Sequence, residues 1–124
     1  MTIQTFLLNS TRDEIKDFFE TQFTHGAVGD DNTTPTPGDT TLGNEVFRKA
    51  IASFDKTTFT NKTIASVQIT SAEANGNTIR EGGFFDAVAA GNMLTHFLVN
   101  DIVKTSDISL YIDGIIEIEV IEDT

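Results

Sequence analysis

The two histidines of this chain, His25 and His96, are its only imidazoles, and they are the first candidates for acid–base or metal chemistry. Neither belongs to a metal-binding spacing such as H-E-x-x-H. His25 stands beside Gly26 at the start of a polar loop, and His96 lies between Thr95 and Phe97 in a predicted strand. Both are interpreted as surface or interface residues rather than as catalytic groups.

Nucleophilic catalysis requires a hydroxyl or thiol within reach of a base and an orienting group. Ser and Thr are plentiful, but the sequence contains no G-x-S-x-G motif. It has no cysteine, which excludes thiolate chemistry and Cys-based zinc sites. The pair Gly82-Gly83 is not followed by the Lys and helix of a phosphate-binding loop. The sequence therefore predicts a protein that is not an enzyme and that uses no cofactor.

Oxygen ligands for calcium or magnesium are concentrated between Gly26 and Gly43. Their spacing does not match an EF-hand loop, so they are interpreted as solvated carboxylates and no metal site is predicted. Binding of Ca²⁺ or Mg²⁺ remains the alternative for this group, which comprises Asp30, Asp31, Asn32 and Asp39.

The same segment, residues 26–43, is predicted to be a loop because it contains both prolines and hardly a large apolar side chain. Long loops without secondary structure are uncommon in compact domains and are often functional. We therefore expect an interface here, with Asp30, Asp31, Thr34, Pro35 and Pro37 as its candidate contacts.

Charge and length limit the classes of partner. The 124 residues have the usual size of one domain, predicted to span 1–124. Nineteen acidic residues against eight basic ones give a net charge of −11, which repels nucleic acid and suits a high-salt, halophilic environment. No apolar run approaches the roughly 18 residues of a membrane span, so membrane insertion is not expected.

One helix is predicted, over residues 9–23. Thr11 and Glu14 have the spacing of a capping box, and Ile15, Phe18 and Phe19 follow at helical spacing as one apolar face. The remainder reads as β structure, with strands predicted at 46–54, 63–70, 78–85, 93–99 and 108–121. Asn75-Gly76 is a hairpin-turn signal.

The last of these strands alternates without a break, and a one-residue slip would bury Asp113 and Glu117. It would be roughly 40 Å long and would leave an exposed edge unless another element or another subunit covers it. Gly114 is interpreted as a bend or bulge. The expected fold is mainly β (α+β), an antiparallel β-sandwich-like domain with one N-terminal helix, a long polar loop and a β-rich core over 45–121.

Three segments occur in a recognisable order: Ala27-Val28-Gly29, then residues 42–49 (LGNEVFRK), then residues 73–86 (EANGNTIREGGFFD). This order resembles the N-terminal module of tail-collar fibre proteins and related baseplate proteins of tailed viruses. The sequence departs from that pattern at Gly82 and at Gly83-Phe84, where the family usually has Ile or Val and Gly-Leu. Family fibres also continue into long shafts, so a small tail component is expected rather than a full fibre.

The resemblance implies a virion structural protein of a virus tail, baseplate or fibre-attachment region. Such a protein is made in the host cytoplasm, assembles with other tail proteins and forms a homo-oligomer, a trimer or hexamer. Together with the acidity, it suggests a phage or haloarchaeal virus of a salt-loving host. The alternative is a module that binds a glycan or protein of the host surface through the 26–43 loop.

The motif residues are expected to form contacts at the scaffold or interface. Glu45 and Arg48 are spaced to pair with neighbouring groups, and Arg80 and Glu81 are placed to do so at a strand junction. Phe84 and Phe85 each offer about 150–250 Å² for burial in the core or between subunits. With the loop residues above, these complete the predicted binding surface.

Overall fold

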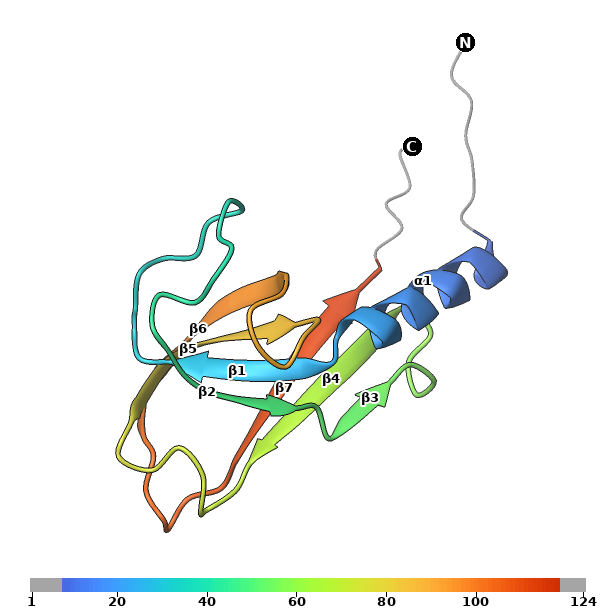
Figure 1. Ribbon diagram of the computed structural model, residues 1–124. Helices are drawn as coiled ribbons and strands as arrows, with labels where there is room; N and C mark the ends of the chain where they lie inside the picture. Colours follow the sequence, from blue (N-terminus) through green and yellow to red (C-terminus); the bar gives the residue numbers. More distant parts are fainter. Residues whose placement is uncertain (1–7, 119–124) are drawn as a thin grey trace.

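Two antiparallel sheets pack face to face, and a helix lies at one end of this sandwich (Figure 1). The computed structural model describes residues 8–118 of the chain. One sheet has the strand order β2-β1-β5-β6 and the other has the order β3-β4-β7. The fold class expected from the sequence is confirmed. The elements within the described residues are α1 (Asn9–Gln22), β1 (His25–Gly29), β2 (Glu45–Ala50), β3 (Ser53–Asp55), β4 (Lys62–Ile69), β5 (Thr78–Phe85), β6 (Met93–Val103) and β7 (Leu110–Glu117).

Strands β4 and β7 follow the alternation predicted from the sequence. Ala65, Val67 and Ile69 are buried, and the residues between them are partly exposed. β7 pairs with β4 along its whole length, with alternate residues half-buried and exposed. β7 begins at Leu110 instead of residue 108, and the part of the predicted strand beyond residue 118 lies outside the described residues.

Gly114 does not bend β7, because the register with β4 runs through it without a shift. The interpretation of this glycine as a bend or bulge is wrong. A Cβ atom here would overlap the ring of Phe84, which is fully buried and packs against Phe23 and Phe97 at ring-centroid distances of 5.8 and 6.2 Å. Gly114 is therefore a site of close approach between the two sheets.

The predicted loop over 26–43 is wrong in its first part, because residues up to Gly29 belong to β1, a strand paired on both sides. The strand has little side-chain volume because the second sheet comes close: a Cβ at Gly26 would lie 2.9 Å from Cγ1 of Val67. β1 consists mostly of small residues, so it lacks the alternation of large apolar side chains that indicates a strand in a sequence. The loop itself connects β1 to β2 and projects from the sandwich, away from the helix (Figure 1).

Other predicted boundaries also change. The strand predicted over 46–54 is two strands, β2 and β3, that belong to different sheets. Asn75-Gly76 does form a turn, with Gly76 at a φ of +88°, but it joins β4 to β5 across the two sheets and is not a hairpin. β5 has the predicted bounds, and β6 extends to Val103.

Helix α1 has the predicted extent, but its start and its apolar face differ. Leu8 is the N-cap, without a side-chain cap, and its carbonyl accepts from Arg12 N at 3.0 Å, so the predicted capping box is wrong. Phe19 packs against the core, as predicted, whereas Phe18 is 58 % exposed. Within residues 8–118, no helix has the length and apolarity needed to cross a membrane.

Replacing Gly114 with Ala should lower the free energy of unfolding by about 1–3 kcal/mol, because the added methyl group must displace the Phe84 ring in a packed interior. The measurement is urea denaturation followed by circular dichroism. Gly38→Ala is the matched control: its Cβ would have no neighbour within 4 Å. Equal stability of the two variants would show that the sheets do not approach as closely as described.

Candidate functional site

The loop of residues 30–44 is folded around the carboxylate of Glu81, a side chain on β5 that is 1 % exposed. Oε1 accepts a hydrogen bond from Gly43 N at 2.8 Å. Oε2 accepts from Asn44 N at 2.9 Å and from Asp31 N at 3.1 Å. A buried carboxylate is tolerated only when its oxygens are paired. The pairing here ties both ends of the loop to the central strand.

His96, on β6, connects the same carboxylate to the tip of the loop. Its Nε2 lies 2.9 Å from Oε1 of Glu81, and its Nδ1 lies 2.7 Å from Oδ2 of Asp39. A neutral imidazole has a single N–H, so both contacts are hydrogen bonds only when the ring carries both protons. The His96 side chain is 9 % exposed, so its interpretation as a surface residue is wrong.

Asp39 is held in its charged form by its neighbours. Thr36 donates to it from its backbone N at 2.9 Å and from its hydroxyl at 2.8 Å. These bonds, together with the bond from His96, lower the pKa of Asp39 to about 2. Its interpretation as a merely solvated loop carboxylate is therefore wrong.

The other loop carboxylates play smaller parts. Asp30 accepts from the side-chain amide of Asn44 at 2.7 Å, and Asp31 contributes its backbone N–H to Glu81. Within the described part of the chain, no group of three or more His, Cys, Asp or Glu side chains is placed to hold a metal ion.

The pairing of β5 with β6 is irregular beside Glu81. Ile79 faces the second sheet, where it packs in a cluster with Val28 and Ile69. Glu81 bonds the loop on the other side of the sheet, although it is only two residues away. The register with β6 shifts between these two residues, because β6 has four residues where β5 has two. Leu42 of the loop covers this outer face by packing on Phe85. β5 is thus buried on both sides, by a sheet on one and by the loop on the other.

Glu45 and Arg48, both on β2, pair with each other. The guanidinium bonds both carboxylate oxygens, with Nη2–Oε1 at 2.6 Å and Nε–Oε2 at 3.2 Å. Its Nη1 also donates to the carbonyls of Ala87 and Ala90, and its plane lies 3.6 Å over the ring of Phe85. Arg48 therefore fixes the β5–β6 connection onto β2.

The predicted interface residues separate into two groups. Thr34, Pro37 and Glu45 are exposed, and Asp30, Asp31, Pro35 and Arg80 are partly so. Arg80 donates to the Asp30 carbonyl at 3.1 Å and lies 3.3 Å from Asp101. In a second group the side chains lie inside the molecule, which agrees with the core and scaffold roles expected for them and corrects their prediction as interface contacts: Arg48, Glu81, Phe84 and Phe85.

Each ring nitrogen of His96 contacts a carboxylate, and these two contacts hold the loop against β5 and β6. Two shallow cavities flank His96, of about 300 Å³ beside Pro35 and Met93 and about 220 Å³ beside Thr33 and Thr41. Sequence reasoning missed the Asp39–His96 pair because its members lie 57 residues apart and belong to no motif.

No protein-family model matches this chain, and no curated protein matches it. The residues on which the resemblance to tail-collar modules depends occupy defined positions in the structure. Glu45, Arg48 and Glu81 hold the loop and the β5–β6 connection in place. The motif is therefore a scaffold that shapes the loop surface.

Replacing Glu81 with Gln should lower the free energy of unfolding by about 3–5 kcal/mol, because it leaves His96 and three backbone donors without their shared carboxylate. Urea denaturation measures the loss. The control is Asp101→Asn, which removes a carboxylate from an exposed ion pair and should cost about 0–1 kcal/mol. Similar losses in both variants would contradict a central role for Glu81.

Stability should depend on pH through Asp39. Its folded pKa, about 2, lies below the usual value of 3.8, so its contribution is fully present above pH 3.8 and is lost as the pH falls toward 2. The urea midpoint of wild type should therefore exceed that of Asp39→Asn at pH 5, and the gap should close by pH 2. If the difference in urea midpoint between wild type and Asp39→Asn stayed constant from pH 5 to pH 2, it would not come from the charge of Asp39.

Proposed function

We propose that this chain is a structural protein of a virus tail, in the baseplate or fibre-attachment region, and that it acts by assembling with copies of itself and with other tail proteins. The observation that carries this proposal is the position of β7 at the edge of its sheet in the part of the chain that the structure describes. It adds to the resemblance of residues 27–86 to tail-collar modules, which supplies the virus-tail context.

β7 is the last strand of its sheet, and β6 is the last strand of the other sheet, within the described residues. Ile118 N donates to Asn61 O at 2.7 Å, so the amides of even-numbered residues in this segment face β4. Because this direction alternates along a strand, the backbone groups of Tyr111, Asp113 and Ile115 point away from β4. An unpaired row of this kind is a template for another strand.

Apolar groups surround this edge. Tyr111 is 68 % exposed and Ile115 is 61 % exposed, both on the outer face of β7. Between the two edge strands lies a groove of about 270 Å³ with a mainly apolar lining, contributed by Ile79, Phe97, Val99, Ile102, Leu110 and Ile112. An apolar groove beside exposed apolar side chains is typical of a protein interface.

A second copy of the chain fits this edge. Antiparallel pairing of two β7 strands centred on Gly114 would place Asp113 opposite Ile115, and Tyr111 opposite Glu117. No like charges then face each other, and the half-buried sides of the two strands form one apolar surface. This contact is twofold. If the loop surface makes a threefold contact as well, the two contacts together form a closed assembly of six copies.

A second candidate function is binding to the host surface. The two shallow cavities beside His96 favour it, because they are bordered by Thr and Pro side chains of a loop whose shape is fixed by Glu81. In this case the loop contacts a glycan or protein of the host, and self-association is not required.

Light scattering after size-exclusion chromatography, at low and at high salt, tests the assembly proposal. Wild type should have six times the monomer mass, and Ile115→Lys should lower it to three times by placing a charge on the pairing edge. The control is Val88→Lys, which changes an equally exposed apolar residue of the β5–β6 connection and should assemble as wild type. A wild-type monomer at both salts would contradict assembly through β7 and favour the host-binding function.

A further inference from the structure

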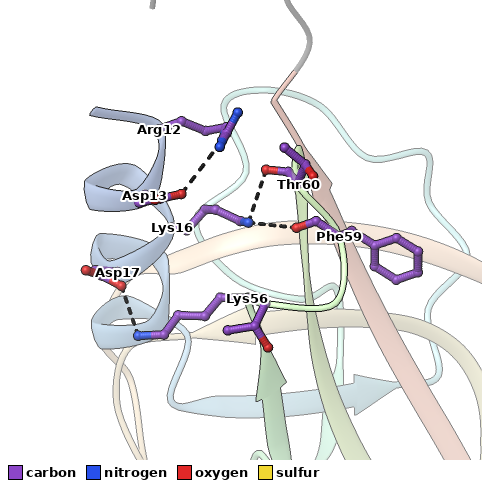
Figure 2. Close-up of a pocket in the computed structure, with 8 residues that line it drawn as sticks. Arg12, Asp13, Lys16, Asp17, Lys56, Phe59 and Thr60 are labelled. Atoms are coloured by element: carbon purple, nitrogen blue, oxygen red, sulfur yellow. Dashed lines mark hydrogen bonds and ion pairs between the residues drawn. The ribbon is translucent and has the colours of Figure 1, made fainter. Parts of the chain in front are cut away.

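Basic residues gather at one cavity of this strongly acidic chain, together with two carboxylates. Three of its eight basic residues, Arg12, Lys16 and Lys56, line a hollow of about 420 Å³ between α1 and the loop that joins β3 to β4. Figure 2 shows Arg12 and Lys16 reaching from α1 toward the same stretch of this loop, at Thr60. Asp13 and Asp17 also border the cavity. Asp13 lies near Arg12, and Asp17 is bonded to Lys56.

Lys16 is a buried cation with an incomplete set of partners. Its side chain is among the buried groups of the chain, with the residue 4 % exposed. Nζ donates to the carbonyls of Phe59 at 2.8 Å and Thr60 at 3.1 Å, which uses two of its three hydrogens. Among the described residues, no ion pair joins it to a carboxylate. Lys16 acts on Asp55 only through space, where it contributes to lowering the pKa of that carboxyl group. A buried charge without a directly bonded counter-charge is costly, and a bound anion would offset that cost.

Arg12 supplies a second donor without a hydrogen-bond partner among residues 8–118. Its Nε is buried and makes no hydrogen bond. The nearest carboxylate oxygen, Oδ1 of Asp13, is 3.7 Å from Nε, which is beyond hydrogen-bond distance. Since Arg12 is one helical turn before Lys16, the two donors belong to the same face of α1.

The rest of the cavity wall is fixed by its own contacts. Lys56 bonds Asp17 at 2.9 Å and Glu20 at 3.1 Å, and these carboxylates raise its pKa. Asp55 accepts from the backbone N–H groups of Thr57 and Thr58, which holds the β3–β4 loop in its turn. The cavity therefore exists before any ligand enters it, and Lys56 is already neutralised.

Lys104 provides a comparison within the same molecule. It is fully buried, and its Nζ donates to two oxygens, those of the Asn75 side chain at 2.8 Å and the Thr105 backbone at 3.0 Å. A buried lysine held by two oxygens is thus not in itself a sign of a ligand. Lys16 differs because it lines an open cavity and has the unpaired Arg12 Nε as a neighbour.

We propose that this cavity binds the oxyanion group of a small ligand, a carboxylate or a phosphate, between Lys16 Nζ and Arg12 Nε. The two donors supply charge-assisted hydrogen bonds, which are about twice as strong as neutral ones. Thr57 and Thr60 border the same space and offer hydroxyl groups to the ligand. The site shares no lining residue with the groove beside β7, so it is independent of the proposed assembly function.

The test is a titration of the ¹⁵N-labelled full chain, followed by amide chemical shifts, at constant ionic strength set with sodium chloride. Inorganic phosphate and a hexuronic acid are the two probes, and glucose is the neutral control. Saturable shifts at residues 12–17 and 57–60, with a Kd of about 1–10 mM, would support the proposal. Response to one probe alone would assign the site to phosphate or to an acidic sugar, and no saturable shift with either would overturn it.

Variants locate the site. Lys16→Met and Arg12→Gln should each weaken binding at least tenfold, whereas Lys49→Gln, which removes the same charge from an ion pair elsewhere on the chain, should leave the Kd within twofold of wild type. Equal weakening in all three would indicate general electrostatic attraction and would overturn the proposed site. Arg12 lies partly at the surface, so Arg12→Gln decides the question if Lys16→Met does not fold.

Discussion

The buried carboxylate of Glu81 is the interaction on which the loop side of this molecule depends. A charge in the interior has to be matched by donors, and here the donors come from both ends of one loop and from a neighbouring strand. Each bond draws a segment of the chain toward β5. The position of Glu81 therefore decides where residues 30–44 lie and which of their side chains reach the surface.

The same constraint explains why β5 is buried on both faces. Its inner face packs on the second sheet through Phe84, and its outer face is closed by Leu42 on Phe85. A polar loop has few apolar groups with which to cover a sheet. The hydrogen bonds to Glu81 and the guanidinium of Arg48 over Phe85 provide the attachment that apolar burial alone does not supply.

Three regions of the molecule differ in charge and in the kind of side chain that they expose. The edge strand β7 presents apolar side chains and unpaired backbone groups, which suits contact with another protein. The cavity beside α1 gathers cations in a chain that has few of them. The loop side is held by a network that joins the carboxylates of Glu81 and Asp39 to the imidazole of His96. The proposed assembly surface, ligand cavity and scaffold thus use separate parts of one small domain.

The sequence by itself determined the elements whose signal is local. Alternation located β4 and β7, and helical spacing located α1, because a half-buried strand or helix must repeat its apolar residues with its own period. Tertiary structure decided what depends on contact between distant residues. β1 is a central strand because Gly26 meets Val67, and both ring nitrogens of His96 contact carboxylates because Asp39 and Glu81 converge on it. Such pairs are separated by tens of residues, and only the packing of the two sheets and the loop brings them within bonding distance.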